Sequence, residues 1–332
     1  METKWSEGVV DRAVGAVVGS ALGDAMGAPY EFGPPRPDAP CELEGGGGFG
    51  WAPGEWTDDT QMALAILGPL AARGPGEPVL LDAIDAAVQA WFSSGPRDVG
   101  NQTRAVLGAA AQHGSSATVA ALAYQAGHPD AAGNGALMRT GPVALAHLGD
   151  RAAVASLARS VAAMTHPHPD SVDACVLWSL ALERAITTAT AESFDWVGSL
   201  QSGLEFVDEG RRAVWAERID EAAGADPVRW SGSNGWVVGA FQAAMAAITS
   251  TPVPTDRPTD HLVRVLEVAS RSGGDTDTVA AIAGALLGAR WGVGVVPEEW
   301  RSKLNGYGRY DQPKLSGADL ERLAQRAVGA AK

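Results

Sequence analysis

Apolar residues recur every three or four positions along almost the whole chain, which is the spacing of one helix face. The first such run covers residues 9–26, and the best strand candidate, residues 293–296, is short and contains Gly294. Further helical runs cover residues 58–72, 78–93, 99–113, 115–127, 136–148, 151–164, 170–187, 202–222, 234–249, 259–271, 277–291 and 317–331. The pattern predicts an all-α fold. It marks no domain boundary, so we expect residues 1–332 to form a single domain.

The first helical run carries four glycines at intervals of four residues, Gly15, Gly19, Gly23 and Gly27. Glycine destabilises a helix interior relative to alanine, so the stripe needs a reason. Close packing against another helix accounts for Gly15 and Gly19. For Gly23 and Gly27, nearer the end of the run, the pattern predicts a bare surface beside a ligand.

A long loop separates the first two helical runs. It is rich in proline and contains the glycine stretch of residues 45–50. A segment of this length without helix signals is commonly functional or disordered. Its position predicts a lid, about residues 29–55, that carries Glu31. The glycines do not form a phosphate-binding loop, because no Lys-Ser or Lys-Thr follows and no strand precedes them.

Two clusters of acids and hydroxyls, far apart in the sequence, each begin a helical run. The first is Thr57-Asp58-Asp59-Thr60 and the second is Asp275-Thr276-Asp277-Thr278. Asp and Thr are common helix N-caps, but capping does not require two acids and two threonines at each helix. Such oxygen donors suit Mg²⁺ or a similar hard cation. If the fold brings the two helix starts together, they would hold one or two divalent ions.

Composition mainly excludes classes of partner. The chain has 332 residues, of which 46% are hydrophobic, so it can bury a large core. Its net charge of −14 disfavours nucleic acid and anionic membranes as partners. Cys41 and Cys175 form no disulfide framework. With neither a signal-peptide start nor an apolar run long enough to span a bilayer, we expect a cytoplasmic protein. No feature of the sequence indicates an oligomer, so we expect a monomer.

Four more helix junctions carry polar residues. They are residues 98–101 with Asp98 and Asn101, residues 133–139, Thr165-His166, and Asn234-Gly235-Trp236. An ordinary capped loop explains any one of the first three. For the fourth, the sequence supplies no role.

Taken together and in this order, the segments resemble the ADP-ribosylglycohydrolases, in particular the dinitrogenase-reductase-activating glycohydrolase group. The resemblance extends from about residue 8 to residue 291, and its motifs are short individually but specific as a set. They are residues 19–31, 56–62, 98–101, 133–139, 165–166 and 273–278. The resemblance implies a compact orthogonal multi-helix bundle with long active-site loops. It also implies a Mg²⁺-dependent hydrolase that cleaves the C1″ glycosidic bond and removes ADP-ribose from an acceptor.

The resemblance further implies a role for each site residue. A dinuclear Mg²⁺ centre, or Mn²⁺ in its place, would be held by Thr57, Asp58, Asp59, Asp275, Asp277 and Thr278. Glu31 and Asp98 would be catalytic, one as acid/base and the other in orienting the substrate, and either assignment is open. The ADP-ribose moiety would be bound by Asn101, Gly133, Asn134, Gly135, Met138 and His166.

Other functions compete with this interpretation. Residues 275–279 also fit the motif of aspartate-nucleophile phosphatases, but that motif needs a preceding buried strand and none is predicted. A non-catalytic ADP-ribose-binding member of the family is a second alternative, against which the retained acids argue. A third is a hydrolase of another ribosylated nucleotide or metabolite. The acceptor stays open among arginine, serine, a nucleic-acid base and a metabolite, with arginine favoured by residues 133–139 and Asp98.

Overall fold

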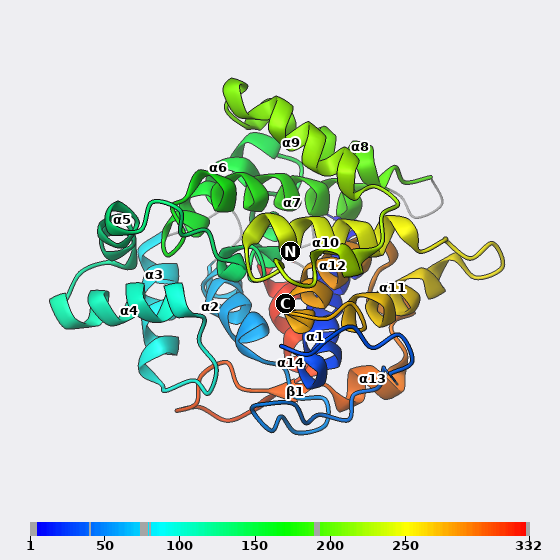
Figure 1. The fold of residues 1–332 in the computed structure, drawn as a ribbon. Helices are drawn as coiled ribbons and strands as arrows, with labels where there is room; N and C mark the ends of the chain where they lie inside the picture. The colour runs from blue at the N-terminus through cyan, green and yellow to red at the C-terminus, as the bar shows by residue number, and fades with distance from the viewer. Residues whose placement is uncertain (1–4, 40, 74–78, 80, 189–192, 330–332) are drawn as a thin grey trace.

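The computed structural model describes residues 5–39, 41–73, 79, 81–188 and 193–329, and this part of the chain is mainly helical (Figure 1). The α-helices are α1 Glu7–Gly27, α2 Asp58–Ala72, α3 Leu81–Ser93, α4 Asn101–His113, α5 Ala117–Gly127, α6 Arg151–Ala163, α7 Pro169–Thr187, α8 Trp196–Gln201, α9 Glu209–Ala222, α10 Val237–Ser250, α11 His261–Ser270, α12 Thr276–Trp291, α13 Glu298–Lys303 and α14 Gly317–Ala327. Strands β1 (Asn305–Gly306) and β2 (Leu315–Ser316) form a small antiparallel pair. The prediction of an all-α fold is confirmed.

Helices α1 and α12 pack along each other at the centre of the molecule (Figure 1). A Cβ atom at Gly15 would lie 2.3 Å from the carbonyl oxygen of Gly288, and one at Gly19 would lie 2.4 Å from that of Gly284. Real side chains do not tolerate such distances, so glycine is what allows the two backbones to touch. The prediction of close helix packing at Gly15 and Gly19 is confirmed.

The same packing continues to the end of α1, and the prediction of a ligand surface there is wrong. A Cβ atom at Gly23 would lie 2.1 Å from the carbonyl oxygen of Ala280, and one at Gly27 would lie 2.5 Å from Cα of Asp277. The backbone of α12 therefore covers both glycines. The contact has a consequence for the site, because it places the first turn of α12 against the last turn of α1.

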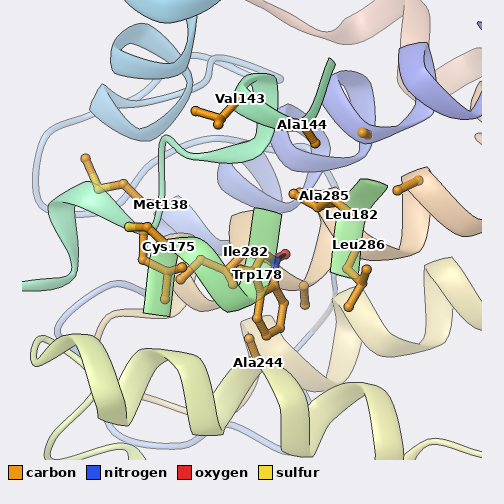
Figure 2. Packing of buried hydrophobic residues seen from close by; sticks show 14 of the residues in the cluster. Met138, Val143, Ala144, Cys175, Trp178, Leu182, Ala244, Ile282, Ala285 and Leu286 are labelled. Carbon is orange, nitrogen blue, oxygen red and sulfur yellow. Dashed lines mark hydrogen bonds between the residues drawn. The ribbon is translucent and has the colours of Figure 1, made fainter. Parts of the chain in front are cut away.

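One part of the hydrophobic core lies where α7, α10 and α12 pack against one another. Trp178 of α7 is fully buried, and its indole Nε1 donates to the carbonyl oxygen of Ile282 at 3.1 Å. Its ring meets Phe241 edge-on with 5.1 Å between centroids. Figure 2 shows the Trp178 ring reaching past Ile282 toward Ala244. The indole thus fills the space between three helices while its one polar atom keeps a partner.

Three predicted elements differ from the structure. Residues 136–148 do not form one α-helix but two 3₁₀ turns, Asn134–Ala136 and Gly141–His147, because Gly141 and Pro142 interrupt the run. The run predicted over residues 202–222 contains the 3₁₀ turn Leu204–Phe206, and the α-helix α9 begins only at residue 209. Helix α8 ends before this run, at Gln201. The strand candidate near Gly294 is a 3₁₀ turn, Val293–Val295.

Some boundaries cannot be compared. The predicted helix start at residue 78 and the predicted helix end at residue 331 lie outside the described residues. Among the helices that the structure describes, none combines the length and the apolar character needed to cross a membrane.

The loop after α1 is attached to the segment that leads into α12. Phe32 N–H donates to the Gly274 carbonyl at 2.7 Å, and Gly274 N–H donates to the Gly33 carbonyl at 2.9 Å. Arg36 N–H donates to the Arg271 carbonyl at 2.9 Å. These bonds place Glu31 beside the start of α12. Movement of the loop as a lid stays a prediction.

Candidate metal and active site

The first acid cluster forms the N-terminus of α2. Thr57 is the N-cap, and its side chain accepts a hydrogen bond from Asp59 N–H. Asp58 and Asp59 are buried in the first turn, where the helix dipole favours negative charge. The local sequence therefore makes a stable helix start and at the same time collects two carboxylates there.

A third acid, Asp24 of α1, supports this helix start. Its carboxylate is fully buried and accepts hydrogen bonds from Thr57 N–H at 2.9 Å, Thr60 N–H at 3.0 Å and the Thr60 hydroxyl at 2.6 Å. Burial raises the pKa of Asp24 to about 6, although these hydrogen bonds oppose the rise. The sequence pattern predicts no role for Asp24 in the site. The available signal was a single acid in the last two turns of a glycine-striped helix, where the surrounding residues 21–28 are otherwise apolar.

The second acid cluster forms the N-terminus of α12, and the structure brings it to the first. The Thr278 hydroxyl donates to the Asp59 carboxylate at 3.3 Å, across 219 residues of sequence. Carboxylate oxygens of Glu31, Asp275 and Asp277 lie within 4.8 Å of one another. The two helix starts therefore meet, and Glu31 lies at the same place.

The electrostatics of this group are those of crowded negative charge. Burial raises the pKa values of Asp58, Asp59 and Asp277 well above the usual range, and neighbouring carboxylates raise them further. Burial raises the pKa of Glu31 to about 9, with Asp275 as the largest charged contributor. A set of buried carboxylates that destabilise each other's charged forms would be neutralised by a bound cation.

The donor set fits a divalent ion that prefers oxygen ligands. Within the described residues, the Asp59 Oδ1 atom is buried and has no hydrogen-bond partner. A buried carboxylate oxygen left in this state requires an explanation, and a ligated ion supplies one. The remaining donors are carboxylates and threonine hydroxyls, which suit Mg²⁺ or Mn²⁺ better than zinc or copper.

Asp98 lies in the loop before α4 and faces the same group. It is half-buried, and burial together with the Asp275 charge raises its pKa to about 6. The preceding residue, Arg97, anchors this loop: its guanidinium lies 4.4 Å from the Trp51 ring centroid and donates to Glu55 at 2.5 Å. Asn101 is exposed in the first turn of α4, and within the part of the chain that the structure describes its side chain forms no hydrogen bond to these acids.

The glycine loop of residues 133–135 contacts the second acid cluster. The Asn134 side-chain amide donates to the Asp275 carboxylate at 2.7 Å. Met138 follows this loop, and its sulfur lies 3.8 Å from the Thr278 hydroxyl. The predicted substrate-binding loop and the predicted metal ligands are therefore in direct contact.

His166 lies behind the glycine loop. A Cβ atom at Gly135 would lie 3.1 Å from His166 Cε1, so glycine permits the close approach of the loop to the ring. The Thr165 hydroxyl lies 2.7 Å from His166 Nδ1 and accepts a hydrogen bond from the guanidinium of Arg139. Burial and the Arg139 charge lower the His166 pKa well below its usual range. The ring is therefore neutral at physiological pH.

Comparison with known proteins agrees with this geometry. The family model for ADP-ribosylglycohydrolase matches residues 6–332. The chain belongs to the ADP-ribosylglycohydrolase family. The predicted resemblance and the predicted class of enzyme are thereby confirmed. The aspartate-phosphatase alternative is wrong, because the chain folds as helices and a loop precedes Asp275 in place of a strand.

Two relatives and one solved structure illustrate the similarity. An ADP-ribosylarginine hydrolase of Pseudomonas putida (strain GB-1) is 30% identical over 312 residues, which cover 91% of this chain and 76% of the relative. An ADP-ribosyl-(dinitrogen reductase) glycohydrolase of Rhodospirillum rubrum is 32% identical over 304 residues, covering 90% of this chain and 91% of the relative. A structure described as an ADP-ribosylglycohydrolase-related protein complex has a TM-score of 0.72 and 26% identity. It covers 98% of this chain and 100% of its own.

Proposed function

We propose that this protein is a Mg²⁺-dependent hydrolase that releases ADP-ribose from an ADP-ribosylated acceptor by cleaving the glycosidic bond at C1″. The observation that carries the proposal is the meeting of the α2 and α12 N-termini, where the Thr278 hydroxyl bonds to Asp59 and Glu31 lies close to Asp275 and Asp277. Family membership supplies the substrate class. The meeting of the two helix starts supports the choice of residues.

The two helix starts would hold two Mg²⁺ ions, with Mn²⁺ as a substitute. The proposed ligands are Thr57, Asp58, Asp59, Asp275, Asp277 and Thr278. When bound, the ions would supply positive charge that orients the ribose hydroxyls and activates water. The crowded carboxylates and the unpartnered Asp59 Oδ1 support this assignment.

Glu31 and Asp98 differ in how readily each holds a proton. Cleavage at C1″ passes through an oxocarbenium-like state, and the leaving atom needs a proton. The pKa of Glu31 is raised to about 9 and that of Asp98 to about 6, chiefly by burial. In the metal-free chain Glu31 thus holds its proton to higher pH than Asp98 does, and a bound cation would lower both pKa values. One of the two carboxyls would donate the proton to the leaving atom and the other would orient the ribose, and either assignment is open.

The rest of the site would hold the ADP-ribose moiety. The proposed binding residues are Asn101, Gly133, Asn134, Gly135 and Met138, which would contact this moiety, and His166, which would act from behind the loop. Two N–H groups of this loop already have partners, since Gly133 N–H donates to Gln102 Oε1 at 3.2 Å and Asn134 N–H donates to the Gly235 carbonyl at 3.3 Å. The absence of side chains at Gly133 and Gly135 is therefore what would let the phosphates approach the loop. Since His166 lies behind this loop and is neutral, it would support the loop without adding charge.

Arginine is the acceptor that we favour. One relative is named as an ADP-ribosylarginine hydrolase. The carboxylates around Asp98 would also attract a guanidinium leaving group, as opposite charges do at short range. Other acceptors would leave the ADP-ribose half of the site unchanged.

The test is release of free ADP-ribose from arginine-, serine- and base-linked substrates, each with Mg²⁺ and with a chelator. We expect release from the arginine-linked substrate with Mg²⁺ and loss of release with chelator. Tight binding of ADP-ribose without release from any substrate would indicate the non-catalytic alternative. Release from small ribosides alone would indicate the metabolite hydrolase.

A further inference from the structure

The segment Asn234-Gly235-Trp236 is the one motif of the sequence that the proposed site leaves without a role. It precedes α10 and lies between the two loops that flank Asp275. We propose that Asn234 is a positioning residue that fixes the Asp275 carboxylate and couples it to the glycine loop of residues 133–135. This inference rests on the proposed function, because it assigns Asn234 a task at the cation site.

The side chain of Asn234 spans the backbone that leads into Asp275. Its Nδ2 donates to the Gly273 carbonyl at 2.9 Å, and its Oδ1 accepts from Asp275 N–H at 3.0 Å. The side chain is buried, with 2% of the residue exposed. An amide is the side chain that can donate and accept in this way, because it carries both an N–H₂ and a carbonyl group.

The main chain of the same segment holds the opposite loop. Asn134 Nδ2 donates both to the Asn234 carbonyl at 2.9 Å and to the Asp275 carboxylate at 2.7 Å. Asn134 N–H donates to the Gly235 carbonyl at 3.3 Å. Asn234 therefore contacts both the backbone of Asp275 and the residue that orients its carboxylate.

Close packing leaves this arrangement little freedom. Gly274 has a φ of +73°, and a Cβ atom there would lie 2.4 Å from Asn234 Oδ1 and 2.1 Å from the Ser231 carbonyl oxygen. The backbone at Gly274, just before Asp275, therefore packs directly against the Asn234 side chain. Hydrogen bonds to ligating carboxylates orient them, and removing such partners typically weakens metal affinity about 10–100-fold.

The test measures Mn²⁺ affinity of the full chain by electron paramagnetic resonance, beside the thermal midpoint in chelator. Asn234→Ala removes the bonds to the Gly273 carbonyl and to Asp275 N–H, which hold the backbone that carries the ligating carboxylate. We expect Mn²⁺ binding to weaken about tenfold, the low end of the loss seen when a direct partner of a ligand is removed. The control is Gln242→Ala, since Gln242 is also buried and its amide donates to the Arg218 carbonyl and to Glu221, both at 3.0 Å. The control should lower the midpoint and leave Mn²⁺ affinity unchanged.

Asn234→Asp keeps the test decisive if the alanine variant does not fold. The aspartate retains the shape and still accepts from Asp275 N–H, but it cannot donate to the Gly273 carbonyl. Its added negative charge would by itself attract a cation. A loss of Mn²⁺ affinity in this variant therefore supports displacement of Asp275.

Two results separate the failure of this inference from the failure of the proposed function. Wild-type Mn²⁺ affinity in a folded Asn234 variant overturns the role of Asn234 and leaves the cation site standing. Absence of Mn²⁺ binding in the wild-type chain overturns the cation site, and the role of Asn234 with it.

Discussion

At the residue scale, the site combines half-buried acids with buried acids, and several of the buried ones accept hydrogen bonds from helix starts. Asp24 is the clearest case, because its bonds to the Thr57 and Thr60 backbone fix the turn that carries Asp58 and Asp59. Burying a carboxylate costs free energy unless its oxygens are hydrogen-bonded. The Asp24 carboxylate has hydrogen bonds to α2, whereas Asp59 accepts them only at Oδ2 and leaves Oδ1 without a partner among the described residues. The unpartnered oxygen, Asp59 Oδ1, belongs to a residue that we assign to the cation.

The Glu31 carboxyl predicts how the stability of the metal-free protein depends on pH. Its pKa is 4.5 when unperturbed and about 9 in the folded chain, chiefly because of burial. Between these values the folded state holds a proton that the unfolded state releases, so the free energy of unfolding falls as pH rises. His166 contributes a slope of the opposite sign, because its folded pKa is lowered, and this contribution fades as pH rises above 6.5.

We therefore expect the thermal midpoint in chelator to fall from pH 7 to pH 8.5, and to fall less in Glu31→Gln. Saturating Mg²⁺ should reduce the slope in the wild-type chain, because a bound cation stabilises the charged carboxylates. Thermal melts across this range provide the measurement. A wild-type midpoint that rises with pH in chelator would contradict the raised pKa.

At the element scale, the contact between α1 and α12 determines where the acids lie. The glycine face lets the two backbones touch from Gly15 to Gly27. As a result, the first turn of α12, with Asp277, lies beside the end of α1, which leads into the loop of Glu31. The same helix carries Asp24, so α1 connects both acid clusters.

Gly23→Ala should therefore be strongly destabilising. The added methyl would lie 2.1 Å from the Ala280 carbonyl oxygen and force the helices apart. Overpacking of this kind costs about 1–3 kcal/mol or more. Gly8→Ala is the matched control on the same helix: its nearest neighbour would be Arg12 Nη1 at 3.4 Å, so helix propensity predicts neutral or slightly stabilising behaviour.

Denaturant unfolding of both variants tests this contact. We expect a lower denaturant midpoint for Gly23→Ala and an unchanged or higher denaturant midpoint for Gly8→Ala. Equal midpoints would mean that the helices accommodate the methyl and that the glycine face is not required.

At the scale of the whole molecule, the sequence predicts the helices better than it predicts their meeting. Periodicity and caps locate α1, α2 and α12 to within a few residues. They do not place Thr278 against Asp59, because that contact joins positions 219 residues apart. The sequence predicts a metal site only if the two clusters meet, and the structure shows that they do.

The limits of the sequence argument have physical causes. The roles of Asp24 and Asn234 depend on partners in distant segments, which no local pattern reveals. The ligand surface expected at Gly23 was wrong because a bare glycine face serves a neighbouring helix as well as a ligand. The prediction of one α-helix over residues 136–148 is wrong because the helical spacing of apolar residues persists across Gly141-Pro142, where the backbone cannot continue as an α-helix.

Equilibrium dialysis decides whether the two helix starts form one metal centre, by counting the Mn²⁺ ions bound per chain in the wild type and in Asp58→Asn and Asp277→Asn. We expect two ions in the wild-type chain and loss of at least one in each variant, with the fold retained. One variant removes an acid from α2 and the other from α12, so both should act on one centre. Wild-type stoichiometry and affinity in both variants would show that the two helix starts do not form a metal centre.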